Sequence, residues 1–142
     1  KPDVAHHWRR AVDADPRIEA WCRMHTGVVL YGEVYGAVQS LKYGLKPGHV
    51  SFCAFAASDK GEWLNTAALL DDSSLPTAPV VYRGPYSADI LHRAEDDSSI
   101  STAPAGHMRE GLVIVPEVER RDDKIGRVAL KHISNRYWEG AD

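Results

Sequence analysis

The first part of the chain has the apolar spacing of helices. From Trp8 onward, apolar residues recur every three or four positions, which is the spacing of one helix face. Asp15 and Pro16 interrupt this pattern, and the pair suits the cap and first turn of a second helix. The sequence therefore predicts two helices that meet near Asp15, with Trp8 and Trp21 as core residues.

Runs of β-branched and aromatic residues predict strands in the rest of the chain. Apolar residues at 28–30 and 34–35 flank Gly32 and Glu33, which predicts one strand with a glycine bend or two short strands. The run at 50–57 predicts a second strand, followed by hairpin turn residues at 58–61. Further short strands are predicted at 80–83, 112–115 and 126–133, and short helices at 65–70, 88–93 and 135–138.

The chain has the length of one domain. Its 142 residues contain no internal repeat and no low-complexity linker, so we predict a single domain over residues 1–142 with its own core. The order of the predicted elements favours an α+β fold with mostly antiparallel sheets and flanking helices.

Composition narrows the class of protein. The net charge is −3, so the chain as a whole lacks the basic character of a domain that wraps nucleic acid. No apolar run approaches the roughly 18 residues of a membrane span, and no signal peptide is visible. Cys22 and Cys53 lack the spacing of a zinc site, so we expect both to be reduced, buried thiols. Reduced thiols are typical of a cytoplasmic protein, which is the compartment we expect. We also expect the protein to be a monomer.

Three charged residues lie in or beside predicted strands. Glu33 interrupts an apolar run, Glu110 and Gly111 precede the strand at 112–115, and Lys131 lies inside the last strand. An ionised carboxylate in a dry site is costly without a partner, so these charges form either structural ion pairs or a functional site. A site for a magnesium nucleotide needs carboxylates for the metal or sugar and a lysine for a phosphate.

The segments around these charges resemble the motifs of the covalent nucleotidyltransferases, the superfamily of ATP-dependent ligases and mRNA capping enzymes. Segments resembling motifs III, IIIa, IV and V occur in the expected order: YGEVYG (31–36), FCAFAA (52–57), REGLVI (109–114) and ALKHIS (129–134). VQSLKYG (38–44) and YRGPY (82–86) resemble connecting segments of one RNA ligase group. The chain therefore resembles an ATP-dependent RNA ligase, although Ala56 stands where an aspartate often follows the second aromatic of motif IIIa.

The resemblance implies a site for ATP or AMP. Glu33 would contact the ribose or help to hold a metal ion, with Tyr35 beside it in the nucleotide site. Phe55, or alternatively Phe52, would stack on the adenine, because an aromatic face binds a base without specific hydrogen bonds.

The resemblance also implies the catalytic residues. Glu110 would bind Mg²⁺ or Mn²⁺, and Lys131 would hold the α-phosphate and stabilise charge during phosphoryl transfer. Arg109 and Ser134 are further candidates for contact with phosphate or RNA. The implied enzyme joins the 5′-phosphate and 3′-hydroxyl ends of RNA through lysyl-AMP and RNA-adenylate intermediates, as in RNA repair.

The lysine nucleophile of this superfamily lies in a KxDG motif, which no part of the chain contains. Lys1 and Asp3 match its lysine and aspartate, but Val4 replaces the glycine, and Lys1 lies too close to Glu33 for the strands that normally intervene. We therefore predict that the chain is the C-terminal portion of an RNA ligase nucleotidyltransferase (ATP-grasp-like) domain. A nucleophilic lysine needs a lowered pKa and fixed geometry, so we expect no self-adenylylation by this portion alone.

Three alternatives stay open. A DNA ligase or capping-type nucleotidyltransferase shares the motifs, although no appended OB-fold pattern is visible. A non-catalytic module that binds a nucleotide or RNA would keep the pocket and lack the nucleophile. An unrelated α+β domain could carry the same charges as buried ion pairs.

Overall fold

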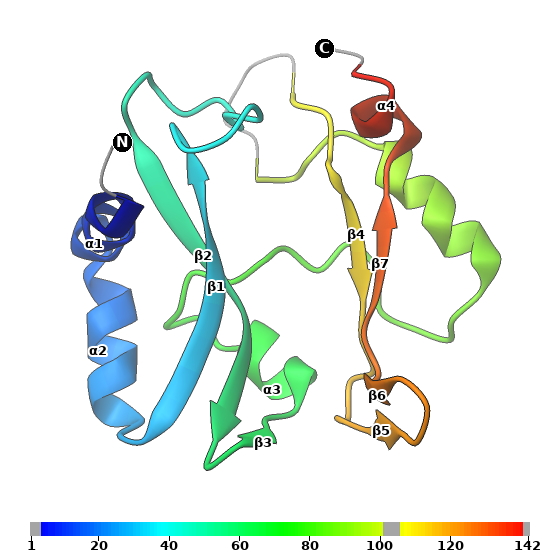
Figure 1. Ribbon diagram of the computed structural model, residues 1–142, viewed down its shortest axis with the longest axis horizontal. Coiled ribbons are helices and arrows are strands. Elements are labelled where there is room, and N and C mark those ends of the chain that lie inside the picture. The colour runs from blue at the N-terminus through cyan, green and yellow to red at the C-terminus, as the bar shows by residue number, and fades with distance from the viewer. Residues whose placement is uncertain (1–3, 101–105, 141–142) are drawn as a thin grey trace.

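Two larger antiparallel sheets stand side by side, and a third sheet is a short two-stranded hairpin. Helices α1 and α2 lie outside the first sheet, helix η1 lies outside the second, and α4 follows the end of its last strand (Figure 1). The computed structural model describes residues 4–100 and 106–140. The helices are α1 (Val4–Ala14), α2 (Pro16–Met24), α3 (Thr66–Leu70), the 3₁₀-helix η1 (Ala88–Glu95) and α4 (Asn135–Trp138). The strands are β1 (Val28–Gly36), β2 (Val50–Asp59), β3 (Glu62–Trp63), β4 (Gly111–Ile114), β5 (Arg121–Asp122), β6 (Gly126–Arg127) and β7 (Leu130–Ile133).

The junction between α1 and α2 follows from Asp15 and Pro16. The Asp15 carboxylate accepts a hydrogen bond from the Arg17 backbone N–H at 3.1 Å, and Pro16 occupies the first turn, where its missing N–H costs nothing. Ile18 and Trp21 are buried on one face of α2. The two helices predicted from the sequence are therefore present and meet at the predicted residues.

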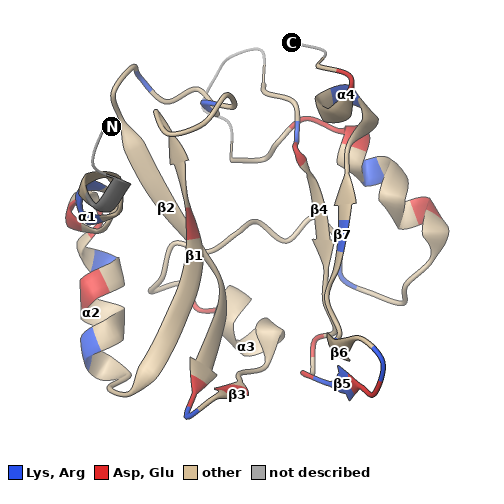
Figure 2. Cartoon of the chain, viewed as in Figure 1, with Lys and Arg blue, Asp and Glu red and all other residues tan. Residues whose placement is uncertain are grey.

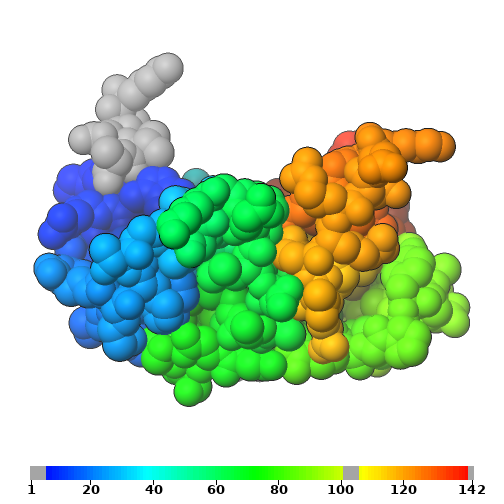
Figure 3. All heavy atoms as spheres, turned by 90° about the horizontal axis from the view of Figure 1, so that it is seen from below, coloured from blue at the N-terminus to red at the C-terminus, as the bar shows by residue number. Residues whose placement is uncertain are grey.

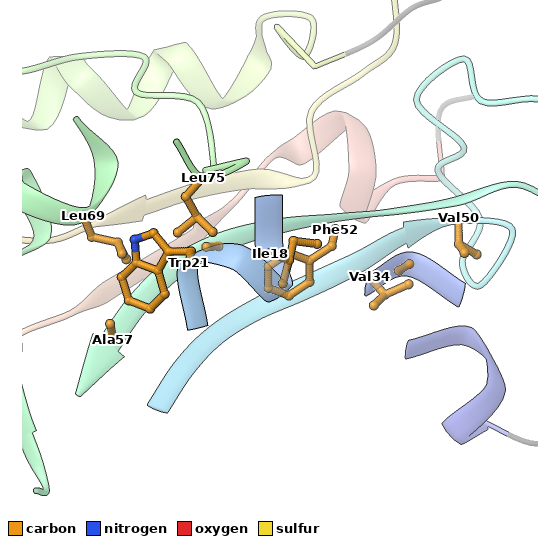
Figure 4. Close-up of a cluster of buried hydrophobic side chains, with 10 residues drawn as sticks. Ile18, Trp21, Val34, Val50, Phe52, Ala57, Leu69 and Leu75 are labelled. Carbon is orange, nitrogen blue, oxygen red and sulfur yellow. The ribbon is translucent and has the colours of Figure 1, made fainter. Parts of the chain in front are cut away.

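Strands β1 and β2 form a long antiparallel pair, and β3 pairs with the end of β2. Side chains from this sheet, from α1 and α2, and from α3 and the loop after it form the main hydrophobic core (Figure 4). Gly32 permits this packing, because a Cβ atom at that position would lie 2.1 Å from the ring of Phe52. The Phe52 ring therefore lies across β1 only because residue 32 is glycine.

Strands β4 and β7 form the second sheet, with Val113 opposite Lys131. The short β5–β6 hairpin lies between them in sequence. Gly111 brings the two strands unusually close, because a Cβ atom there would lie 2.1 Å from the carbonyl oxygen of His132. Both η1 and α4 flank this sheet (Figure 1).

The two sheets are connected at both ends. At one end, Leu41 and Tyr43 from the β1–β2 loop pack with Met108, which precedes β4. At the other end, the guanidinium of Arg127 lies over the ring of Trp63 at 4.0 Å. The view from below in Figure 3 shows residues of the hairpin region, in orange, directly against residues of the first half, in green. These contacts fix the position of one sheet relative to the other.

The predicted fold class is confirmed, and several local predictions are wrong. Residues 80–83 form no strand, and the predicted strand at 126–133 is divided into β6 and β7. Trp8 touches the edge of Phe52 but remains 45% exposed, and Cys22 is exposed because it points away from the side of α2 that buries Trp21. No helix within residues 4–100 and 106–140 is long and apolar enough to cross a membrane.

Candidate functional site

The centre of the site is an ion pair between the two strands of the second sheet. Glu110 directly precedes β4, and the Nζ atom of Lys131 on β7 donates to its Oε1 atom at 2.8 Å. The Ser134 backbone N–H donates to the Glu110 carbonyl oxygen, which holds the start of β4 against the end of β7. The hydrogen bond to Glu110 raises the pKa of Lys131, so the lysine is fully charged at neutral pH.

Glu33 on β1 lies close enough to interact with this pair. Partial burial raises the pKa of the Glu33 carboxyl, and the negative charge of Glu110 raises it further, while Lys131 acts in the opposite direction. Figure 2 shows red on β1 and blue on β7, the two strands that carry Glu33 and Lys131. The structure thus brings together all three charged residues that the sequence singles out.

Cys53 lies directly opposite Glu33 on the neighbouring strand. Burial raises the pKa of its thiol to about 11, and the charge of Glu33 contributes to this rise. The thiol is therefore neutral near pH 7, and it supplies a small apolar surface beside the carboxylate rather than a nucleophile.

The two candidate aromatic residues on β2 occupy different environments. The register of β1 and β2 skips Phe55, since Tyr31 pairs with Ala56 and Gly32 pairs with Ala54, and this bulge leaves Phe55 46% exposed. Phe52 is only 6% exposed and belongs to the core (Figure 4). The structure therefore corrects the alternative that Phe52 stacks on a base, because its ring already packs against core residues.

Two tyrosines border the site on the side of the β1–β2 loop. Tyr35 packs edge-to-face against Tyr43, with ring centroids 5.8 Å apart. Burial raises the pKa of Tyr43 to about 12, and a hydrogen bond from the Glu110 backbone opposes this rise. Tyr43 therefore connects the loop to Glu110, the residue directly before β4, and no local pattern in the sequence indicates this contact.

Glu95 has a structural role that sequence reasoning missed. The acidic run that begins at Glu95 has the composition of a solvated surface. In the structure, however, the Glu95 carboxylate accepts hydrogen bonds from the backbone N–H groups of Asn135 and Arg136, at 2.9 and 3.3 Å. It also accepts one from the hydroxyl of the buried Ser134. These hydrogen bonds, of which the bond from Asn135 has the largest effect, lower the pKa of Glu95. Glu95 thus anchors the segment that follows Lys131.

Arg109 reinforces the same anchor. Its guanidinium donates to the carbonyl oxygens of Arg93 and Asp97, at 3.0 Å for Asp97. Because Arg109 precedes Glu110, and Ser134 follows Lys131 closely, η1 and the residues after it hold both members of the ion pair. The interactions of Arg109 and Ser134 in the structure are therefore those of positioning residues.

Val113 is a second residue that the sequence did not single out. It is the direct cross-strand partner of Lys131, so both side chains project from the same face of the sheet. It is 64% exposed, which is unusual for a valine in the middle of a strand. The sequence of β4 is uniformly apolar, so it carries no signal that Leu112 is buried while Val113 is exposed beside Lys131.

The side chains present would hold a divalent cation only with other ligands. Within residues 4–100 and 106–140, no three His, Cys, Asp or Glu side chains gather as a metal centre. Glu33 and Glu110 supply two carboxylates that repel each other, and a cation would relieve this repulsion. Mg²⁺ commonly binds one or two carboxylates and takes its remaining ligands from water and phosphates, so the pair fits such an ion.

Comparison with known proteins identifies the family. The RNA ligase family model matches residues 2–133, and the chain therefore belongs to the RNA ligase family. No curated protein matches the chain. Lys1 and Asp3, which resemble part of the lysine motif, lie outside the described residues.

Two solved structures of an RNA ligase from Naegleria gruberi are similar to this chain at 22% identity. The structure with PPi has a TM-score of 0.62, and that of a mutant with AMP and Mn has a TM-score of 0.64. Each comparison covers 99% of this chain and 42% of the solved chain. The chain therefore shares its fold with a part that makes up less than half of the length of each solved chain.

Proposed function

We propose that this chain is part of an ATP-dependent RNA ligase. In the proposed reaction, a lysine amine attacks the α-phosphorus of ATP and releases pyrophosphate. The 5′-phosphate of RNA then displaces the lysine to form an RNA-adenylate. Finally the 3′-hydroxyl of a second end attacks that 5′-phosphate and releases AMP. Membership of the RNA ligase family supports this reaction class.

The proposal depends most on the arrangement of Lys131, Glu110 and Glu33. The Lys131 amine lies 2.8 Å from the Glu110 carboxylate, and the Glu33 carboxylate interacts with both. The site therefore offers a positive charge to the phosphates and negative charges to the metal ion of a bound metal–nucleotide complex. Phosphoryl transfer requires mainly positioning and charge stabilisation from the protein. Lys131 is proposed to leave Glu110 and to hold the α-phosphate when ATP binds.

Glu110 and Glu33 are proposed to hold Mg²⁺ or Mn²⁺ together with the phosphates of ATP. The metal supplies positive charge that neutralises the phosphates and makes the α-phosphorus easier to attack. The similar Naegleria gruberi structure with AMP and Mn is consistent with this cofactor set.

The base of ATP is proposed to bind between apolar surfaces. Phe55 offers an exposed ring on β2, and Val113 offers an exposed side chain on β4 beside Lys131. Stacking on an aromatic ring contributes about 1–3 kcal/mol per base. Tyr35 is proposed to border the nucleotide next to Glu33, whose carboxylate would also reach the ribose.

The chain is proposed to be the C-terminal portion of a nucleotidyltransferase domain. It spans 42% of the length of the similar ligases and contains no KxDG motif. The nucleophilic lysine would then belong to a part of the protein outside these 142 residues, and the intact protein would be a cytoplasmic monomer that acts on RNA ends.

The test is adenylylation of the intact protein with α-labelled ATP and magnesium, read as a covalent protein–AMP band on a denaturing gel. A labelled band on the intact protein, and none on residues 1–142 alone, would support the proposal. Label on residues 1–142 would identify a nucleophile within them. No label on either, with ATP still bound, would favour a nucleotide-binding module without catalytic activity.

Two substitutions assign the roles within the site. Lys131→Ala or Glu110→Ala in the intact protein is expected to abolish sealing of RNA ends while leaving the urea unfolding curve almost unchanged, because the pair is partly exposed. Lys60→Ala, in the β2–β3 turn, is the matched control and should seal normally. Full sealing by either site variant would refute the assignment.

A further inference from the structure

The loop between β1 and β2 carries only positive charge. Residues 37–49 include Lys42, Lys46 and His49, and the sequence has no acidic residue between Glu33 and Asp59. Figure 2 shows blue and no red along this loop. The whole chain has a net charge of −3, so this segment has the opposite sign to the protein that carries it.

The cationic side chains of the loop surround a shallow hollow. Lys42 and Lys46 are exposed, and both line a cavity of about 250 Å³ together with Ala37, Leu45, Pro47 and Gly48. Arg10 of α1 adds a third cation at its rim by donating to the carbonyl oxygen of Gly48. No ion pair of these three cations is present among the described residues, so no carboxylate there neutralises their charge.

The loop is held beside the candidate active site. Tyr43, which lies between the two lysines in sequence, is 7% exposed and interacts with the backbone of Glu110. Leu41 packs with it against Met108, two residues before Glu110. The cationic loop is therefore attached at the Glu110 end of the second sheet.

We propose that this basic loop, residues 37–49 with Arg10, binds the backbone phosphates of an RNA strand whose end is joined at Glu110 and Lys131. This inference rests on the proposed ligase function and adds the surface that holds its polynucleotide. Flexible lysines are suited to contacts with phosphates, which position a strand without reading its sequence. An acidic protein also needs a local basic patch to attract a polyanion.

The test measures RNA affinity against salt for the Lys42→Gln/Lys46→Gln variant of the intact protein. The probe is a fluorescent 20-nucleotide single-stranded RNA with a 5′-phosphate, read by anisotropy between 50 and 400 mM NaCl. The slope of log K against log salt is negative, and each lost phosphate contact reduces its magnitude by about 0.7. The slope of the variant should therefore be shallower by on the order of 1.4. With equal affinities at about 1 M salt, this corresponds to about 25-fold weaker binding at about 0.1 M salt.

The matched control is Lys60→Gln/Lys124→Gln. It removes the same charge from the β2–β3 turn and from the β5–β6 hairpin, both at the opposite end of the molecule (Figure 1). It should change the affinity less than threefold and leave the slope unchanged. Equal effects of the two double variants would overturn the inference, because affinity would then follow net charge alone.

Two further readouts separate the inference from the proposed function. The Lys42→Gln/Lys46→Gln variant should form protein–AMP from ATP at the wild-type rate, because neither lysine is among the residues proposed to hold ATP. If the wild type fails to form protein–AMP but the loop variant still loses RNA affinity, the ligase proposal fails and the RNA surface stands. If the double variant unfolds, the single variant Lys46→Glu replaces it, because this substitution breaks no side-chain hydrogen bond among the described residues. Lys46→Glu should still weaken RNA binding. Normal RNA binding by Lys46→Glu would refute the inference.

Discussion

Gly111→Ala tests whether the close contact of β4 and β7 supports the site. The added Cβ atom would lie 2.1 Å from the His132 carbonyl oxygen and 2.9 Å from the Cα atom of Ile133. Both obstructing atoms belong to the backbone, so no side-chain rotation relieves the clash. To reach an ordinary contact, the strands must separate locally by more than about 1 Å, against a normal spacing of about 4.8 Å.

The expected cost of Gly111→Ala is about 3 kcal/mol, the upper part of the range for overpacking, because the strain falls on strand hydrogen bonds. Urea unfolding followed by tryptophan fluorescence should therefore show a midpoint lower by on the order of 1 M. Glu110 adjoins the altered residue, and Lys131 lies two positions from Ile133. A shift of about 1 Å in their contact should slow adenylylation of the intact protein by roughly 100-fold.

Gly61→Ala separates this clash from the ordinary cost of replacing glycine. Gly61 has a φ of +88°, and a Cβ atom there would meet nothing within 4 Å. It should lose about 1 kcal/mol from backbone strain alone and adenylylate at the normal rate. An unchanged midpoint and adenylylation rate for Gly111→Ala would show that the two strands do not need to approach this closely.

Other substitutions distinguish binding residues from core residues. Phe55→Ala should weaken ATP binding by about 10- to 100-fold in calorimetric titration with no loss of stability, whereas Phe52→Ala should lower the free energy of unfolding by about 3–5 kcal/mol. Asp15→Ala should cost about 1 kcal/mol at pH 7 through loss of the helix cap. The hydrogen bond to Arg17 lowers the pKa of Asp15 in the folded state. The stability difference between the wild type and Asp15→Ala is therefore present above the ordinary pKa of 3.8 and disappears as the pH falls through the lower, folded-state pKa. Urea unfolding curves between about pH 7 and 2.5 would detect this loss.

The regular elements could be predicted from the sequence because local signals specify them. Asp15 with Pro16 encodes a helix start, and the β-branched runs of β1 and β2 encode strands. The predictions were wrong where tertiary contacts determine the secondary structure. Residues 80–83 have strand composition, but they have no partner strand within residues 4–100 and 106–140, and an extended segment without a partner does not form a sheet.

The charged residues of the candidate site could be predicted from the sequence, but the contacts that arrange the site could not. Glu33, Glu110 and Lys131 are conspicuous because charged residues are unusual in or next to apolar strands. The choice between Phe52 and Phe55 was not available from composition, because a bulge in β2 and the glycine at position 32 determine which ring is exposed. Glu95 was missed because its partners lie about 40 residues away in sequence.

The position of Glu33 implies that the site reduces stability in the absence of nucleotide. Burial and Glu110 raise the folded-state pKa of Glu33 above its ordinary 4.5, so the folded state binds a proton more tightly than the unfolded state. The cost is therefore absent below the ordinary pKa, grows as the pH rises towards the folded-state pKa, and is complete above it. Glu33→Gln removes the charge and should raise the urea midpoint at pH 7.5, with no difference from the wild type near pH 3.5, while nucleotide binding is lost. A lower midpoint for Glu33→Gln at pH 7.5 would show instead that attraction to Lys131 outweighs both repulsion and burial.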